Sequence, residues 1–342
     1  MKTPSLSLRD FIARLWPVWA PFLVLAWTVG TIILPDFGPD EPYHVGYIDT
    51  LARDGRVPTS KENHLVQHPP TYHLALAPLW KMLGVDQRPL SLTPGPQASK
   101  QMTPSALRAR VVLRALQPLL ALLTLLLMAK TLALLDVPRH WQLLLLGFAA
   151  AWPMFGYISG VINNENASIL FAALACYLIV KLLRHASTGV AAVKTVGADV
   201  ENTEQIKIQN GIDVSVKQAA ILGLIMGAGA LIKQTALFSL PLGLCALWLT
   251  SLRPQRGRNV GVAAVAAVAA GFWWPLRNWL VAGDPFPSFT MPVDQNTPSL
   301  GEKLTQVPGF SRLILETNFL PDWSWVFFPR TLSTAAAALL IG

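Results

Sequence analysis

The chain has 342 residues, of which 52% are hydrophobic and 13% are charged. A soluble globular domain carries roughly 25% charged residues, so this composition excludes an ordinary soluble protein. The formal net charge is +8, but the basic residues are scattered over the ends of apolar segments and form no single stripe, which argues against a nucleic-acid partner.

Apolar runs predict seven membrane-spanning helices. A helix needs about 20 apolar residues to cross a hydrocarbon core of about 30 Å. The runs lie at about 16–34, 111–135, 141–161, 166–183, 219–232, 236–252 and 260–281. An eighth run begins near Thr331, and because the sequence stops inside it at Gly342, we expect a fragment that lacks its C-terminal part.

Basic residues decide the sidedness of these spans. The fifth and sixth runs are short, and Lys233 and Gln234 interrupt what could be one long helix. With the basic N-terminus inside, two crossings at this point place the loop of Arg253, Arg256 and Arg258 inside, as the positive-inside rule requires. A single crossing would place that loop outside.

The predicted fold is therefore an all-α integral membrane protein, a polytopic helical bundle of about seven to eight spans. Residues 1–15 form a cytoplasmic N-terminus, and residues 16–342 form one multi-pass transmembrane domain. Within it, 35–110 is a long first outer loop with short interfacial helices, 185–217 is a cytoplasmic insertion, and 282–328 is another outer loop. We expect the plasma (inner) membrane, with membrane lipids as partners.

Two features of the apolar runs concern packing. The GxxxG pattern from Gly223 to Gly227 predicts close contact between helices. The two cysteines, Cys176 and Cys245, lie inside separate apolar runs, so we expect small core residues with no disulfide framework or zinc spacing.

The stretch after the first span carries the first candidates for chemistry. In Pro39-Asp40-Glu41-Pro42-Tyr43-His44, Asp40 suits a helix N-cap and Glu41 favours the positive helix end. Capping alone would explain this motif. Asp40 and His44 are also four residues apart and share a helix face.

A carboxylate at this water–lipid boundary could act as a general base towards a hydroxyl. Together with Glu41 and His44, Asp40 could instead hold a divalent cation, for which Mg²⁺ or Mn²⁺ would suit these ligands. Spacing alone does not separate the capping, base and metal interpretations.

A second polar motif, Gln67-His68-Pro69-Pro70-Thr71-Tyr72-His73, precedes the apolar run Leu74 to Leu83. This run is too short to span a membrane and is therefore expected to be interfacial or re-entrant. The two prolines predict an extended start. Starting this helix and binding a ligand are the two interpretations of the motif.

These two motifs resemble the first outer loop of the GT-C superfamily of polytopic glycosyltransferases, in particular the protein-mannosyltransferase-like glycosyltransferase family 39. Other segments are similar in the same order across roughly residues 36–330. They are Asn163-Asn164-Glu165, Leu231-Ile232-Lys233-Gln234-Thr235, Trp274-Pro275-Leu276-Arg277-Asn278 and Gly283-Asp284-Pro285-Phe286. The sequence departs from the family at Thr71 and His73, where Leu and Tyr are frequent, and Pro42 with His44 suggests a side branch.

The resemblance implies a hexosyltransferase-type enzyme that takes a sugar from a polyprenyl-phosphate carrier at the outer face. It would transfer the sugar to a hydroxyl of a glycan, lipid or protein, with inversion. Asp40 is similar to the acidic residue that acts as base in the family, and Glu41 would orient the acceptor or hold a metal. An inverting transfer needs a carboxylate opposite the leaving phosphate and cations beside that phosphate.

Lys233 and Arg277, at the expected outer ends of the fifth and seventh runs, are candidates to bind the phosphate, and Arg114 is a weaker one. A charge beside a span is costly, which makes it a candidate functional residue. The alternative is snorkelling to the interface, which neighbouring tryptophans favour at Arg277.

The remaining candidates for substrate binding are His44, His68, Tyr72, Glu165 and Asn278. Glu165 could be a second acid in an outer cavity, or the segment 163–165 could cap the fourth span. Two other functions stay open. One is a transporter or flippase of a lipid-linked or polar substrate, and the other is an assembly or sensor subunit without catalysis.

Overall fold

The computed structural model describes residues 12–35, 38, 40–59, 62–85, 102–197, 212–283 and 285. The expected eighth span near Thr331 and almost all of the expected outer loop 282–328 lie outside these residues. Residues 1–11 of the N-terminus and 198–211 of the expected insertion lie outside them as well.

The described part of the chain is all-α, and none of its residues belongs to a strand. In chain order the helices are α2 (Trp16–Ile32), α3 (Glu41–Asp54), η1 (His64–Gln67), α4 (Thr71–Met82), α6 (Pro104–Leu134), α7 (Arg139–Ala151), α8 (Pro153–Ser159), α9 (Glu165–Gly197), α10 (Val216–Ala230), η2 (Gln234–Phe238), α11 (Ser239–Thr250), η3 (Arg253–Gln255), α12 (Arg256–Gly271) and α13 (Trp273–Ala282). All seven expected apolar runs are therefore helical over most of their length.

Two of these helices are long and apolar enough to cross a membrane by themselves, namely α6 and the Glu165–Ser187 part of α9. Two pairs qualify only if each is one bent span: α7 with α8, bent by 63°, and Arg253–Gly271 with Trp273–Val281, bent by 48°. The described residues thus contain two to four candidate spans by length and composition. Seven were expected, but the remaining runs form helices of 10–17 residues.

Prolines and a charged residue explain why several runs are broken. The α7–α8 bend falls at Trp152, whose backbone is extended because Pro153 follows it. Lys233 is likewise extended and separates α10 from η2, so the fifth and sixth runs form two separate helices. This agrees with the predicted interruption at Lys233 and Gln234.

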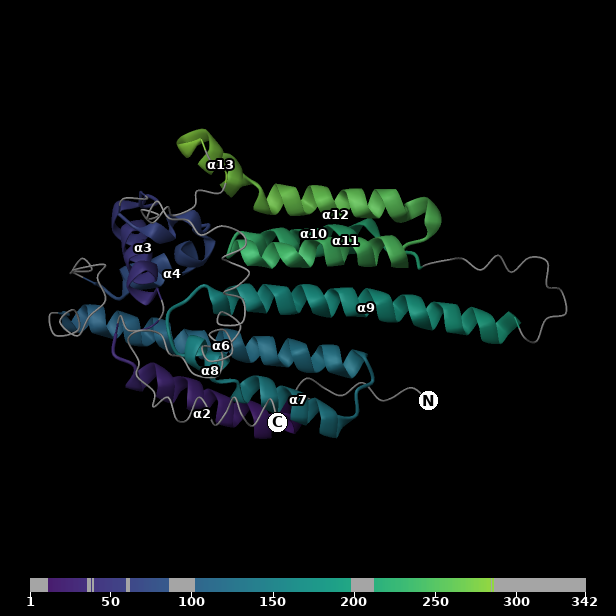
Figure 1. Ribbon diagram of the computed structural model, residues 1–342, viewed down its shortest axis with the longest axis horizontal. Coiled ribbons are helices and arrows are strands. Elements are labelled where there is room, and N and C mark those ends of the chain that lie inside the picture. The colour runs from purple at the N-terminus through teal and green to yellow at the C-terminus, as the bar shows by residue number, and fades with distance from the viewer. Residues whose placement is uncertain are drawn as a thin grey trace, which may run out of the picture.

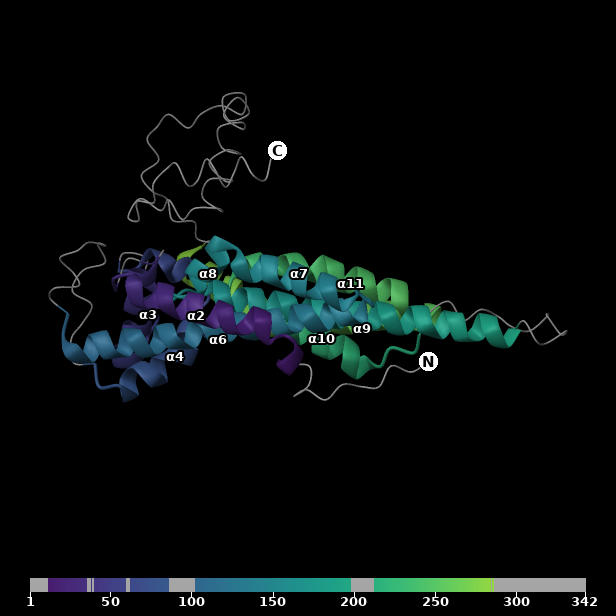
Figure 2. The ribbon, with the colours of Figure 1, turned by 90° about the horizontal axis from the view of Figure 1, so that it is seen from below.

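The long helices lie side by side along the long axis of the molecule (Figure 1). Helices α3, α4 and α13 gather at one end, which we call the α3–α4 end. At the opposite end, the α9 end, the C-terminal part of α9 extends past the other helices. Figure 2 shows the same elongated arrangement from below.

Glycines allow the closest contact in the bundle, between α10 and α12. A Cβ added at Gly223 would lie 2.2 Å from the carbonyl oxygen of Ala263, and one added at Gly227 would lie 2.4 Å from that of Ala267. Only glycine fits at such distances. The packing role predicted from the GxxxG pattern is therefore confirmed.

Large apolar side chains cover the outer surface of the long helices. Leu144, Leu249 and Val265 are 58–69% exposed, as expected for a surface that contacts lipid instead of water. Cys176 and Cys245 are also exposed, so the prediction that they are core residues is wrong. Hydrophobicity alone does not distinguish a core position from a lipid-facing one, because both are apolar.

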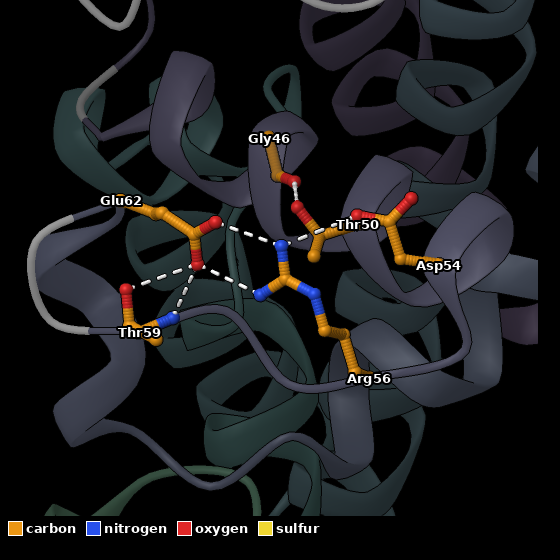
Figure 3. Close-up of polar contacts among 6 residues, drawn as sticks. All are labelled: Gly46, Thr50, Asp54, Arg56, Thr59 and Glu62. Carbon is orange, nitrogen blue, oxygen red and sulfur yellow. Dashed lines mark hydrogen bonds and ion pairs between the residues drawn. The ribbon is translucent and has the colours of Figure 1, made fainter.

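The chain after α2 forms short helices, as expected for this loop. Helices α3 and α4 pack around Val45, Ile48 and Trp80, together with Leu113 of α6. Arg56 holds the connection between α3 and η1 by donating two hydrogen bonds, of 2.7 and 2.8 Å, to the carboxylate of Glu62 (Figure 3). These contacts fix α3 and α4 as one unit at the α3–α4 end.

Candidate functional site

Asp40 occupies the N-cap position of α3, which is the position that the sequence predicted. Its side chain makes no capping hydrogen bond, however, and its backbone is left-handed with φ of 55°. Residues other than glycine seldom adopt this conformation, and among them Asp and Asn tolerate it best. Asp40 is exposed. Because its side chain makes no capping hydrogen bond, its carboxylate does not serve α3 in the way that the capping interpretation expects.

Glu41, the next residue, is fully buried and forms an ion pair with Arg114 of α6. Arg114 donates from Nε to Oε1 at 2.7 Å and from Nη2 to Oε2 at 2.5 Å. The backbone N–H of Ile162 also donates to Oε1, at 3.2 Å. Glu41 therefore connects α3 to α6 and to the turn between α8 and α9.

The Arg114 guanidinium uses all five of its N–H donors inside the protein. Besides its bonds to Glu41, it donates to the carbonyl oxygens of Gly30, Ile33 and Leu34 at the end of α2. No donor remains for a phosphate, so the geometry gives Arg114 a structural role in place of the predicted one.

The charge state of Glu41 follows from this pairing. Burial alone would raise the pKa of Glu41, but the charge and hydrogen bonds of Arg114 outweigh burial and leave the pKa below its usual value. Glu41 is therefore ionised, and both of its oxygens accept hydrogen bonds. Although Glu41 is next to Asp40 in sequence, its carboxylate is engaged by Arg114 and is not available to a substrate hydroxyl.

His44 and His73 form a buried pair between α3 and α4. Nδ1 of His44 lies 2.9 Å from Nε2 of His73, and neither side chain is more than 1% exposed. The His73 ring also stacks on Tyr47, with the ring centroids 4.0 Å apart. Burial lowers the pKa of both histidines, so both are neutral at neutral pH and one donates to the other.

Tyr72 belongs to a different buried network. Its hydroxyl donates to Oε1 of Gln117 at 3.1 Å, and Asn166 donates to the same oxygen from Nδ2 at 3.3 Å. This network joins α4, α6 and α9. Tyr72 is 5% exposed and is part of the packing between helices.

Lys233 forms an ion pair with Glu165, which begins α9. Asn164 ties the same two segments together by donating to the carbonyl oxygen of Ile232 at 3.1 Å. Asn163 accepts a hydrogen bond from the backbone N–H of Glu165 at 2.8 Å, so the predicted capping of this helix is confirmed. Glu165 and Lys233, both candidates from the sequence, are in direct contact.

Arg277 lies on α13 over the ring of Trp274, with its guanidinium carbon 4.9 Å from the ring centroid. It donates from Nη1 to Oδ1 of Asn278 at 3.1 Å, and Asn278 is almost fully buried. Trp274 in turn donates to the carbonyl oxygen of Gln67 at 3.3 Å. This bond brings α13 next to the segment that holds His68.

The electrostatic neighbours of His44 show which candidates gather. Burial lowers the pKa of His44 most and His73 lowers it next, while Asp40 raises it and His68 and Lys233 lower it further. Asp40, His68 and Lys233 are therefore each close enough to His44 to influence it. Together with Glu165, the ion-pair partner of Lys233, they form a polar cluster that draws on the start of α3, the η1–α4 connection, the start of α9 and the α10–η2 connection.

An apolar cavity of about 160 Å³ is lined in part by the sequence neighbours of two cluster residues, Gln234 beside Lys233 and Pro69 beside His68. It is lined by Met226 and Ala230 of α10, by Gln234 next to Lys233, and by Phe272 and Trp274. Pro69, the neighbour of His68, closes one side. The cavity therefore involves the residue after Lys233 and the first turn of α13, the helix that carries Arg277.

The described residues contain no group of three or more His, Cys, Asp or Glu arranged to hold a metal ion. Of the three ligands considered for a divalent cation, Glu41 is bound by Arg114 and His44 by His73.

Sequence reasoning missed His73 and Tyr47 as members of the site, and it did not find the partner of Glu41. The signal for His73 was present in the motif that contains His68, but a pairing with His44 over 29 residues has no local signature. Comparisons of the chain with protein-family models, with curated proteins and with solved structures give no match.

Proposed function

We propose that this protein is a membrane glycosyltransferase that moves a sugar from a polyprenyl-phosphate donor to a hydroxyl acceptor, with inversion. The observation that carries the proposal is that an exposed carboxylate, Asp40, and a cationic group, Lys233, both act electrostatically on His44, while Gln234, next to Lys233, lines an apolar cavity. The motif resemblance to the GT-C superfamily supports the same reaction.

Asp40 is the general base in this proposal. It is exposed, whereas its neighbour Glu41 is buried and ion-paired, so Asp40 is the carboxylate that an acceptor hydroxyl can reach. Accepting the proton of that hydroxyl makes the oxygen a better nucleophile towards the anomeric carbon, and the bond from that carbon to the phosphate oxygen breaks. Glu41 is a positioning residue, because its pairing with Arg114 fixes the start of α3.

Lys233 and Arg277 neutralise the phosphate as it leaves. Lys233 is 20% exposed and is held by Glu165, so donor binding exchanges one anionic partner for another. Arg277 approaches the same region from α13, where the ring of Trp274 orients it. His68, between η1 and α4, completes the binding surface, and the buried Asn278 holds Arg277 in place.

The apolar cavity accommodates the first isoprenyl units of the donor. Its lining of small and aromatic side chains from α10 and α13 suits a branched hydrocarbon and offers few polar groups. A water-soluble nucleotide sugar would gain little from such a surface. This feature favours a lipid-linked donor.

The proposed topology places the site at the outer face. The main helices alternate in direction along the bundle (Figure 1), so seven crossings from a cytoplasmic N-terminus bring α3, α4, Glu165, Lys233 and α13 to the same side. The short helices α2, α10 and α11 then cross with flanking residues reaching the interface. The plasma (inner) membrane is the proposed location.

Mass spectrometry of lipids that co-purify with the protein and with its Asp40→Asn variant tests the proposal. Asn has nearly the same shape and tolerates the left-handed backbone, but it accepts no proton. We expect a polyprenyl-phosphate sugar to be enriched in the variant, and its transfer in a reconstituted assay to be slower by about 10²-fold or more. Asp54→Asn, at the other end of α3, is the matched control and should transfer normally.

Two outcomes would contradict the proposal. Normal transfer by Asp40→Asn would remove the base assignment. If a lipid-linked substrate moved across the membrane of reconstituted vesicles and no covalent product formed, the protein would be a transporter or flippase and not an enzyme.

A further inference from the structure

The α9 end of the bundle is strongly basic and plays no part in the proposed reaction. Helix α6 ends there, α7, α10 and α12 begin there, and the Glu165–Ser187 part of α9 approaches it. The basic residues described in this region are Arg14, Lys130, Arg139, Lys181, Arg184, Lys217, Arg253, Arg256 and Arg258, and the described acidic ones are Asp136 and Asp213. Such an excess attracts anions at a membrane surface.

A cavity of about 530 Å³ lies between α9 and α10 in this region. Leu178, Leu182 and Leu222 form its aliphatic floor, and Lys181 and Gln218 lie on its rim. Lys181 and Leu182 follow Leu178 by three and four residues, so all three face α10 from the same side of α9. The cavity therefore combines an apolar groove with polar groups at one edge.

The polar groups on the rim differ in whether they already have hydrogen-bond or ion-pair partners. Lys181 forms no ion pair with any described residue, whereas Arg184, which does not line the cavity, is paired with Asp136. The side-chain oxygen of Gln218 accepts from Ser215 in a capping box, which leaves its amide nitrogen as a donor. Asp213, the one carboxylate among the described residues that line the cavity, accepts a hydrogen bond from Gln255 at 2.8 Å.

We infer that this cavity binds an anionic phospholipid of the surrounding membrane. Lys181 and the Gln218 amide hold the phosphate of the headgroup, and an acyl chain follows Leu178, Leu182 and Ile221 along the groove. The aliphatic floor and the exposed side chain of Ile221, on the outer side of α10, favour a lipid over a soluble phosphate. The inference is independent of the proposed transferase activity.

Native mass spectrometry of the purified chain, titrated with phosphatidylglycerol or phosphatidylethanolamine, tests this site. We expect phosphatidylglycerol to be retained more strongly, and Lys181→Gln to weaken its retention about fivefold, as a single basic group near an anionic headgroup contributes about that factor. Lys181→Arg keeps the charge and should restore retention. Lys130→Gln removes an exposed charge of the same region outside the cavity and should change little.

Two results would overturn the inference. One is equal retention of phosphatidylglycerol by the unmodified chain and by Lys181→Gln. The other is displacement of the lipid by glycerol phosphate at similar concentration, because a soluble anion would then be the ligand. Ile221→Asn, at an exposed apolar position of the lining, should weaken phosphatidylglycerol binding without affecting glycerol phosphate.

Discussion

The two ends of the helical bundle differ in how their charged side chains are placed: one end pairs them, and the other exposes them. At the α3–α4 end, Glu41 and Arg114 are buried against each other, and Lys233 is paired with Glu165. At the α9 end, Lys181, Lys217 and Arg258 are exposed. The first arrangement depends on side-chain geometry, whereas the second depends mainly on the sign of the charge.

This difference indicates where stability depends on the exact geometry of charged side chains. Removing a charge from water costs several kcal/mol unless a partner with good geometry compensates, so buried pairs persist only where the protein supplies such a partner. Exposed charges cost little and can be exchanged for one another. We therefore expect substitutions at the α3–α4 end to have large effects and those at the α9 end to have small ones.

The largest effect is expected from Glu41→Ala. It leaves the Arg114 charge buried without its main partner, which should lower the free energy of unfolding by about 3–5 kcal/mol. Asp54→Ala, which removes a partly exposed partner of Arg56, should cost no more than about 1 kcal/mol. Thermal unfolding followed by tryptophan fluorescence in detergent measures both, and the comparison breaks if the two variants unfold alike.

Glycine substitutions compare backbone packing at the two ends. A Cβ at Gly30 would lie 2.7 Å from the carbonyl oxygen of Gly160, whereas one at Gly261 meets nothing within 4 Å. Gly30→Ala should destabilise by about 1–3 kcal/mol because α2 and α8 must separate. Gly261→Ala, inside α12, should stabilise by up to about 1 kcal/mol. The same unfolding measurement decides, and a loss of stability in Gly261→Ala would count against an open site there.

The smallest effect is expected at Glu62, on the exposed surface of the α3–α4 end. Hydrogen bonds from Arg56 and Thr59 lower the pKa of Glu62 from 4.5 to about 2. A lowered pKa stabilises the fold above the unfolded value and loses this contribution as pH falls through the folded value. The difference in melting temperature between the chain and Glu62→Gln should therefore be constant above pH 4.5 and shrink towards about pH 2. A difference that does not change with pH would assign the effect to shape instead of charge.

Local features of the chain were predictable because their signals are local. The start of α3 after Asp40, the cap of α9 at Asn163 and the close packing at Gly223 and Gly227 each depend on a few neighbouring residues. The separation of the fifth and sixth runs at Lys233 follows in the same way, since a charged residue interrupts an apolar pattern. The position of Asp40 before α3 was a local signal, whereas its role as base was implied by the family resemblance.

Contacts between distant segments were not predictable from one sequence. Glu41 and Arg114 are 73 residues apart, and nothing in the spacing of either residue names the other. Lys233 and Glu165 were both candidates, yet their direct pairing follows only from the way α9 begins next to the α10–η2 connection. Arg114 was a candidate to bind a phosphate because it is a charge near a span. The sequence does not reveal that all five of its donors are engaged within the protein.

The sequence by itself determined the all-α class, the apolar runs that became helices and the residue types available for chemistry, because hydrophobic pattern and capping act over a few turns of helix. Only the tertiary structure decided which of two adjacent carboxylates is exposed. Glu41 faces α6 and the α8–α9 turn, where Arg114 and Ile162 meet its oxygens, whereas Asp40 lies one residue earlier at the surface. Burial and pairing depend on the whole fold, so they give neighbouring residues of similar chemistry different roles.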